Sequence, residues 1–385
     1  MWKKQPHLNQ PIPFIENRYS LSDKKAVVQA LKFGNLQGSG KYSQGVQDFF
    51  RSRYGFQYNY FTPSCTDALE LSALAINLTS HDEVIVPSYT FPTTAHAFYL
   101  RGARIVLADS REDHPNVCVS SILEQLTHKT KAICIVHYGG VAVDGLKNLI
   151  SICQEKKIFL IEDAAQAIDA YWNGQPLGSF GDFAAFSFHQ TKNISCGEGG
   201  LCVVKSPELA RRVEIIREKG TNRQAFLRGE VDKYTCVDVG SSFVGSDLNA
   251  ALLLSQLKQM EDLHHNRKKI WQFYWEQYAT SRFKLPKIDT QAQHNAHNFI
   301  LLLPNESLRQ KFIDYMKEHG IHCTFHYVPL HLSPFYGKHS LSRTPLKNAE
   351  KWGNGLVRLP LFNHMSLEQA QYVVEISEQF AQNYL

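Results

Sequence analysis

A lysine, Lys192, stands between the apolar run AAFSF at 184–188 and the glycine-rich turn GEGG at 197–200. An amine at the end of a buried strand loses part of its hydration, which lowers its pKa and makes it a nucleophile toward carbonyl compounds. A lone lysine in a loop is usually an ordinary surface residue. The segment upstream of Lys192 favours the chemical interpretation.

That segment is IFLIED at 158–163, in which four apolar residues predict a short buried strand that ends at Asp163. Ligands of open α/β sheets collect at the carboxyl ends of strands. An aspartate there, followed by a lysine after the next strand pair, is the arrangement that a pyridoxal phosphate (PLP) enzyme needs. The lysine forms the Schiff base, and the aspartate keeps the pyridine nitrogen protonated so that the ring acts as an electron sink. We therefore predict Lys192 and Asp163 as catalytic residues and PLP, with its amino form PMP, as the cofactor.

Several motifs occur in the same order as in a known family: PSCTDALE at 63–70, VPSYTFP at 86–92, VHYGG at 136–140, IEDAAQA at 161–167, GDFAAFSFHQTKNISCGEGG at 181–200 and FHYVPLH at 325–331. Together they closely resemble the sugar-nucleotide aminotransferases of the DegT/StrS type, which are fold-type I PLP enzymes. The resemblance extends from PIPF at 11–14 to LPLF at 359–362. The segments REKGTNR at 217–223 and DKY at 232–234 look like the subgroup that makes dTDP-4-amino-4,6-dideoxygalactose.

The resemblance implies roles for residues around the cofactor. Gln166 would hydrogen-bond the phenolic oxygen, and Phe91 would lie flat on the pyridine ring, although an aromatic residue after a strand is usually part of a core. Ser187 and the turn at Cys65 and Thr66 would hold the phosphate. A polar turn that opens a helix can bind an anion, but it can equally be an ordinary helix cap. Most members carry Gly or Ala in place of Cys65.

Further roles concern the substrate and a second subunit. In relatives an asparagine from the partner reaches the phosphate, whereas this chain has Ser242 at that position, as the galactosamine-type subgroup does. His326 and Tyr327 match a His-Tyr pair near the sugar, and Arg223 lies in a basic segment that we expect to bind the diphosphate. His189 either orients the lysine loop or is simply hydrogen-bonded in the core. The resemblance also implies a homodimer.

The reaction implied is transfer of an amino group from L-glutamate to C4 of dTDP-4-dehydro-6-deoxy-D-glucose, giving dTDP-4-amino-4,6-dideoxy-D-galactose. The gluco epimer is the alternative product. The sugar 3-dehydratase branch has histidine where Lys192 stands, and a non-catalytic regulator on the same fold would not need Lys192, Asp163 and Gln166. The sequence leaves open whether the pathway serves enterobacterial common antigen, lipopolysaccharide O-antigen or another glycan.

Composition narrows the class of protein. Hydrophobic residues make up 43% and charged residues 20% of 385 residues, as in an ordinary soluble enzyme. The net charge of +5 is too small for a nucleic-acid coat but suits an anionic small substrate. The eight cysteines form no C-x-x-C pair and show no metal-ligand spacing, so we expect no metal, and free thiols fit a reducing cytoplasm. We expect no signal peptide and no membrane span.

The elements that position these residues alternate between strands and helices, which predicts an α/β fold with a mostly parallel seven-stranded sheet. The strands are expected at 58–62, 83–87, 104–108, 131–137, 158–161, 184–188 and 200–204. We expect an N-terminal arm at 1–20, a large PLP-binding domain at 21–255 and a small C-terminal α+β domain at 256–385. One long helix at about 246–278 should link the domains. The small domain should contain strands at 298–303 and 321–325 and helices at 306–319 and from 366.

Overall fold

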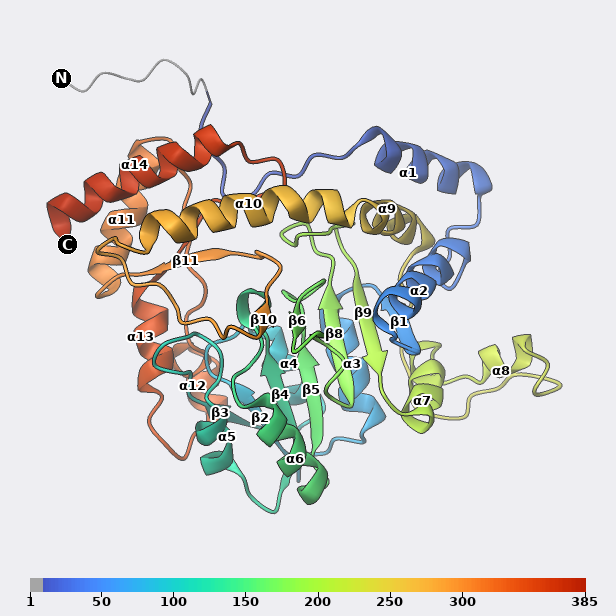
Figure 1. The fold of residues 1–385 in the computed structure, drawn as a ribbon. Coiled ribbons are helices and arrows are strands. Elements are labelled where there is room, and N and C mark those ends of the chain that lie inside the picture. The colour runs from blue at the N-terminus through green and yellow to red at the C-terminus, as the bar shows by residue number, and fades with distance from the viewer. Residues whose placement is uncertain (1–9) are drawn as a thin grey trace.

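An eight-stranded sheet lies at the centre of the computed structural model, which describes residues 10–385 (Figure 1). Its strand order is β1-β9-β8-β5-β4-β2-β3-β12. Strand β9 runs antiparallel to both of its neighbours, and the other pairs are parallel. The strands are β1 (Tyr58–Thr62), β2 (Glu83–Pro87), β3 (Arg104–Ala108), β4 (Thr130–Val136), β5 (Phe159–Asp163), β8 (Phe183–Ser187), β9 (Gly200–Val204) and β12 (Ser340–Leu341).

The seven expected strands all form, so the predicted mostly parallel sheet is confirmed. The eighth strand, β12, was not expected, because its two residues come from the C-terminal part of the chain and pair with the edge strand β3. A strand of two residues has no periodic pattern that sequence analysis could detect. Its position depends on how the C-terminal part folds back onto the sheet.

Alternate residues of the central strands enter two different apolar cores. Val84 and Val86 of β2 pack in a core with α3 (Cys65–Ala75), α4 (Thr93–Tyr99) and α7 (Pro207–Arg217). Ile85 lies on the other face, in a core with α5 (Val119–Gln125) and α6 (Leu146–Lys156). Helices therefore cover both faces of the sheet, which explains why the sequences of these strands are continuous apolar runs. The helix α2 (Lys41–Tyr54) and part of β8 form a third core.

The expected long helix at 246–278 is wrong, because the segment forms two helices, α9 (Asp247–Lys258) and α10 (Met260–Tyr278), with different axes (Figure 1). The break is at Gln259, whose side chain donates to the Ser255 carbonyl at 2.9 Å and to Asp23 Oδ1 at 3.0 Å. Asp23 belongs to α1 (Leu21–Phe33) and also accepts hydrogen bonds from Ser255 and Gln256. The break is thus stabilised by a tertiary contact and not by Pro or Gly.

The C-terminal part packs around a two-stranded antiparallel sheet of β11 (Phe299–Leu302) and β13 (Leu356–Leu359). Helices α10, α11 (Glu306–Glu318) and α14 (Leu367–Tyr384) share its apolar core, and α13 (Lys347–Gly355) precedes β13. The strand expected at 321–325 is absent from the described residues. Only isolated bridges form there, from Ile321 to Ile12 and from Thr324 to Arg358.

Several short elements complete the described chain: β6 (Tyr171–Trp172), β7 (Gln175–Pro176), β10 (Ala292–Gln293), α8 (Arg223–Leu227), α12 (Tyr336–His339) and the 3-10 turns Tyr138–Gly140 and Leu330–Leu332. The segment around α8 projects away from the body of the molecule (Figure 1). Of the expected N-terminal arm, residues 1–9 lie outside the described residues. Ile12 lies against the C-terminal part, where its N–H donates to the Gly320 carbonyl at 2.8 Å.

Candidate active site

Asp163 and Lys192 lie on a strand and on the segment that follows its parallel neighbour. Asp163 is the last residue of β5 and lies opposite Ala185 of β8, and Lys192 lies in the segment that joins β8 to β9. Burial lowers the pKa of Lys192 and raises the pKa of Asp163, and the opposite charge of each residue counteracts both shifts. The two residues predicted as catalytic are therefore close enough to influence each other electrostatically.

The Asp163 carboxylate is held in one orientation. Thr94 Oγ1 donates to its Oδ2 at 2.7 Å, and the Ala165 N–H donates to its Oδ1 at 3.1 Å. Thr90 Oγ1 lies 2.8 Å from Thr94 Oγ1 and continues this chain of hydroxyls. Hydrogen bonds to a buried carboxylate favour its charged form against desolvation. Thr94 was not predicted as a site residue, because a threonine near a strand end has many common structural roles.

The loop that carries Lys192 is attached to the C-terminal half of the chain through its next residue. Asn193 Nδ2 donates to the Asn295 carbonyl, and its Oδ1 accepts from His297 Nδ1, both at 2.9 Å. Asn363 Nδ2 donates to the Asn193 carbonyl, also at 2.9 Å. These bonds fix the backbone beside Lys192. Sequence analysis missed them because the partners are about 100 or more residues away.

Gln166 and Tyr327 join the sheet to the C-terminal half on the other side of the site. Gln166 Oε1 accepts from the Gly139 N–H at 2.7 Å, and its Nε2 donates to Tyr327 Oη at 3.1 Å. The ring centroids of Phe91 and Tyr327 are 6.0 Å apart, and 53% of Phe91 is exposed. Phe91 therefore presents an open aromatic face at the strand ends and is not a core residue. The structure brings these three predicted residues together.

The predicted phosphate site lies where β9 crosses the start of α3. A Cβ atom on Gly200 would lie 2.3 Å from the Ser64 carbonyl carbon and oxygen and 2.5 Å from Cys65 N, so only glycine permits this approach. Gly200 is paired with Ser187, which places that side chain beside the turn. Ser64 Oγ caps the helix by accepting from the Asp67 N–H at 3.1 Å. The turn is thus a helix cap and, in addition, lies beside a predicted phosphate ligand.

Two other predicted residues, Ser242 and Arg223, lie away from the lysine loop. Ser242 is exposed and forms an isolated antiparallel β-bridge with Glu218. Arg223 lies 3.8 Å from the Glu218 carboxylate, at the base of the projecting segment. Among residues 10–385 no hydrogen bond or ion pair joins either residue to the lysine loop. His189 does belong to that loop, where its Nδ1 hydrogen-bonds Thr191 Oγ1 at 2.9 Å and its side chain is 39% exposed.

His326 contacts a buried arginine, Arg358, that was not predicted from the sequence. Arg358 Nη1 donates to His326 Nδ1 at 2.6 Å, and Arg358 is only 4% exposed. Burial, followed by the charges of Arg358 and Lys192, lowers the pKa of His326 to about 3. The sequence did contain one indication of this residue, because Arg358 is the charged residue inside the apolar strand LVRL of β13. A charged side chain in such a strand is rarely buried without a partner.

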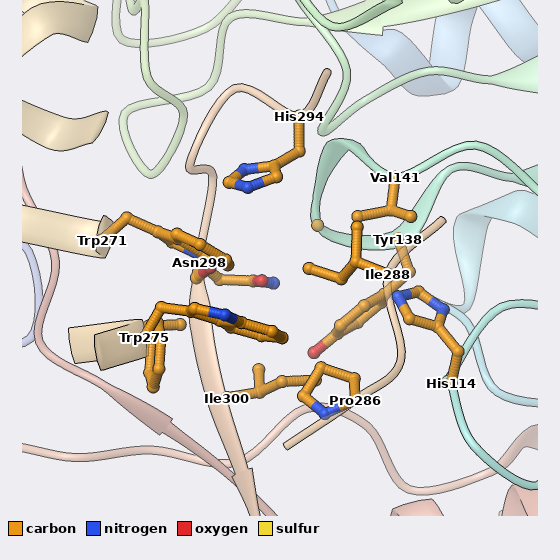
Figure 2. Close-up of a pocket in the computed structure, with 12 residues that line it drawn as sticks. His114, Tyr138, Val141, Trp271, Trp275, Pro286, Ile288, His294, Asn298 and Ile300 are labelled. Atoms are coloured by element: carbon orange, nitrogen blue, oxygen red, sulfur yellow. Dashed lines mark hydrogen bonds between the residues drawn. The ribbon is translucent and has the colours of Figure 1, made fainter. Parts of the chain in front are cut away.

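A separate pocket has Tyr138 and Gly139 among its lining residues, and Figure 2 shows it. Its walls include the stacked indoles of Trp271 and Trp275, whose centroids are 5.0 Å apart, and two histidines, His114 and His294. Burial lowers the pKa of His114 to about 3 and that of His294 to about 4. Both rings are therefore neutral at pH 7. Its remaining lining residues are Val141, Pro286, Ile288, Asn298, Phe299 and Ile300.

Across residues 10–385 we find no group of three or more His, Cys, Asp or Glu side chains that could hold a metal ion. No helix in the same range has the length and apolar character needed to cross a membrane.

Residues 19–377 match the DegT/DnrJ/EryC1/StrS aminotransferase family. An uncharacterized protein of Methanocaldococcus jannaschii is 32% identical over 328 residues, which cover 83% of this chain and 85% of that protein. A Streptococcus pneumoniae protein assigned as a sugar aminotransferase, solved in PLP and PMP forms, is 25% identical in its PLP form with a TM-score of 0.90, covering 97% of this chain and 100% of that one. DesV of S. venezuelae is 26% identical with a TM-score of 0.88, covering 97% and 99%.

Proposed function

Because the chain belongs to the DegT/DnrJ/EryC1/StrS aminotransferase family, we propose that it aminates a sugar nucleotide, with L-glutamate as the amino donor. The acceptor is C4 of dTDP-4-dehydro-6-deoxy-D-glucose, and the product is dTDP-4-amino-4,6-dideoxy-D-galactose. The cofactor is PLP, as in the S. pneumoniae relative solved in its PLP and PMP forms. The family membership supports transamination, and the segments at 217–223 and 232–234 support this acceptor.

The residues at the strand ends fit PLP. Gly200 leaves room for a backbone cradle at the turn of Cys65, where an anion can be bound by N–H groups and the helix dipole. Asp163 supplies a buried carboxylate with fixed orientation, and Phe91 supplies an open aromatic face. Lys192 supplies an amine whose pKa is lowered by burial. The four parts of PLP therefore each have a complementary group: the turn at Cys65 for the phosphate, Asp163 for the pyridine nitrogen, Phe91 for the ring and Lys192 for the aldehyde.

Each residue then has a definite role. Asp163 holds the proton on the pyridine nitrogen, and Ser187 with the turn at Cys65 and Thr66 holds the phosphate. Gln166 binds the phenolic oxygen. The cofactor supplies an electron sink that stabilises negative charge at the donor Cα. Lys192 removes the proton from that Cα as a general base, for which a lowered pKa is suited.

The observation that carries the proposal is that Asp163 ends β5 and Lys192 lies in the segment that follows β8, the parallel neighbour of β5, where each residue acts on the pKa of the other. A regulator that had lost catalysis would have no need for a buried, oriented carboxylate beside an amine of lowered pKa. The choice of the galacto product rests on the resemblance of the segment that contains Arg223. The gluco epimer is the other outcome of the same chemistry.

The test is to incubate the purified enzyme with PLP, L-glutamate and dTDP-4-dehydro-6-deoxy-D-glucose and to isolate the product. Proton NMR then reads the coupling between H3 and H4 of the sugar. A small coupling means an axial amine and the galacto product, whereas a large trans-diaxial coupling means the gluco epimer. If 2-oxoglutarate forms with neither sugar, this acceptor is wrong.

A further inference from the structure

Two loops that carry predicted cofactor residues meet at one turn of the C-terminal part. The glutamine loop (residues 164–170) contains Gln166, and the lysine loop (residues 188–199) joins β8 to β9. Asn295 Nδ2 donates to the Gln166 carbonyl at 2.9 Å, and the Asn295 carbonyl accepts from Asn193 Nδ2, also at 2.9 Å. Asn295 is completely buried. One asparagine therefore connects the two loops.

The turn that contains Asn295 has a strained backbone. The next residue, Ala296, has a φ of 54°, in the left-handed region that a residue with a Cβ atom rarely adopts. Its N–H donates to His294 Nδ1 at 3.1 Å, and its carbonyl accepts from Arg267 Nε at 3.0 Å. A strained residue persists only where the surrounding contacts impose its conformation, and such residues cluster at functional sites.

Arg267, on α10, completes a ring of hydrogen bonds around the residue that follows Lys192. Its Nη2 donates to the His297 carbonyl at 2.7 Å, and its Nη1 donates to Asn363 Oδ1 at 3.3 Å. His297 Nδ1 lies 2.9 Å from Asn193 Oδ1, and Asn363 Nδ2 donates to the Asn193 carbonyl at 2.9 Å. Carbonyl acceptors therefore compensate for the burial of Arg267, and α10 determines where Asn193 lies.

The bond between His297 and Asn193 has a defined direction. The Asn193 amide nitrogen already donates to the Asn295 carbonyl, so Asn193 Oδ1 is the acceptor and His297 Nδ1 is the donor. Burial, followed by the charge of Lys192, lowers the pKa of His297, so the ring is neutral at pH 7. With its proton on Nδ1, His297 holds Asn193 without adding a charge to the lysine loop.

We propose that Asn193, Asn295 and His297 are positioning residues, which hold the lysine loop and the glutamine loop at one fixed separation from a turn anchored to α10. The inference rests on the proposed aminotransferase function. Lys192 and Gln166 would act on the aldehyde and the phenolic oxygen, which are neighbouring groups of one rigid ring. An amine misplaced by about 1 Å can slow a reaction by about 100-fold. The separation of the two loops therefore decides how well the amine meets the aldehyde.

Hydrogen exchange of the full-length, cofactor-free protein measures both loops without any turnover. The Gln190, Lys192 and Cys196 amides are hydrogen-bonded within the lysine loop. In Asn193→Ala their exchange should be about 10-fold faster, because two buried hydrogen bonds that hold the loop are lost. In Asn295→Ala the faster exchange should appear in the glutamine loop instead, because Asn295 holds the lysine loop through its backbone carbonyl.

Asn59→Ala is the matched control, because it removes a buried asparagine of β1 whose Nδ2 donates to the Gln47 and Phe56 carbonyls. Both loops should exchange in this variant as they do in the wild type. His297→Leu should reproduce the effect of Asn193→Ala on the lysine loop. His297→Asn should restore part of the protection, since its amide N–H can replace the donor at Nδ1. This pair decides the matter if Asn193→Ala does not fold.

The reactivity of Lys192 gives a second readout. PLP is added to the cofactor-free protein, and the covalent adduct is trapped with borohydride and measured by mass spectrometry at successive times. Adduct formation should be at least 10-fold slower in Asn193→Ala and normal in Asn59→Ala. During turnover, kcat should fall in Asn193→Ala while the KM for the sugar nucleotide stays close to normal, because no group that contacts the substrate is removed.

Unchanged exchange of the lysine loop in folded Asn193→Ala or His297→Leu overturns the proposal, as does an equal increase in Asn59→Ala. Faster exchange with normal adduct formation also overturns it, because the loop would then be held without consequence for Lys192. If the wild type itself forms no adduct with PLP, the aminotransferase function is wrong. That failure is distinct, because it appears in the unaltered protein and does not depend on the exchange measurement.

Discussion

Thr94 Oγ1 donates a 2.7 Å hydrogen bond to Asp163 Oδ2, while a backbone N–H occupies the other carboxylate oxygen. Thr94 lies in the first turn of α4, and Asp163 ends β5, so the bond connects two elements that are adjacent only in the folded chain. Burial raises the pKa of Asp163, and the hydrogen bond from Thr94 opposes that shift by favouring the charged carboxylate. This contact makes Thr94 a positioning residue for the proposed pyridine partner.

Thr94→Val should therefore lower kcat by about 10-fold or more, since a hydrogen bond to a charged group contributes ~1.5–3 kcal/mol. The pKa of Asp163 should rise further, so the loss of kcat should be greater as the pH falls. Steady-state rates between pH 6 and 8.5 measure both effects. Thr130→Val, which removes a buried hydroxyl at the start of β4, is the control. Equal, pH-independent losses in both variants would argue against the positioning role.

Asp163→Asn should reduce turnover by orders of magnitude and weaken PLP binding much less. An amide cannot stabilise a protonated pyridine, whereas the phosphate and ring contacts remain. Rates of glutamate consumption and equilibrium dialysis of PLP separate the two effects. Asp182→Asn removes a carboxylate that caps Leu160 at the other end of β5 and should leave turnover close to normal. Near-wild-type turnover in Asp163→Asn would contradict the assignment.

Lys192→Ala should fold but carry no covalently bound cofactor, because no other amine of the described site lies beside Asp163. Borohydride reduction followed by mass spectrometry should show the PLP adduct in the wild type and in Lys205→Ala, but not in Lys192→Ala. Lys205 lies at the far end of β9, where its Nζ contacts the Phe180 carbonyl. An adduct that persists in Lys192→Ala with normal turnover would disprove the role of this lysine.

Acid should destabilise the protein partly through His294, whose folded-state pKa of about 4 lies below the ordinary value of about 6.5. Between these values the unfolded chain takes up a proton that the folded chain does not. The free energy of unfolding therefore falls as the pH is lowered from 6.5 to 4, by about 3 kcal/mol for this group. Above pH 6.5 the group contributes no pH dependence.

Urea unfolding of the wild type and His294→Gln at pH 7.5 and pH 4.5 measures this contribution. The variant should lose less stability between the two pH values, even if losing the contact with Trp271, 4.0 Å away, lowers its stability at both. His265→Gln, on the exposed side of α10, should behave like the wild type. The same pH dependence in all three proteins would rule out His294 as a contributor.

The protein should be a homodimer with two sites at its interface. The projecting segment exposes apolar side chains that a monomer would leave in water, among them Leu227 at 59%, Tyr234 at 53% and Val239 at 55%. Leu227→Glu should shift the sedimentation velocity profile toward monomer and lower activity together with it. Leu100→Glu, at an exposed position that ends α4, serves as the control. A dilute wild-type sample that is both monomeric and active would contradict the dimer.

Seven strands of the large sheet could be predicted because they are short, mostly apolar runs, and the alternate residues of the central strands enter two covered faces, as Val84 and Ile85 do. The ends of such strands also indicated where Asp163 and Lys192 would meet, since parallel neighbours bring their carboxyl ends to one edge. The break at Gln259 could not be predicted, because no helix-breaking residue marks it and its cause is a contact with Asp23, more than 200 positions away.

The amino-acid sequence by itself predicted seven of the eight strands and the family, and it singled out Asp163 and Lys192 as the proposed catalytic pair, because strand periodicity and ordered local motifs require no knowledge of distant contacts. Only the tertiary structure decided how the site is held. Thr94 reaches Asp163, and His297 reaches the lysine loop, through hydrogen bonds between segments far apart in the chain. Likewise, Arg358 is one arginine among many until folding buries it against the His326 ring. Burial and long-range pairing, and not residue type, distinguish these residues from their neighbours.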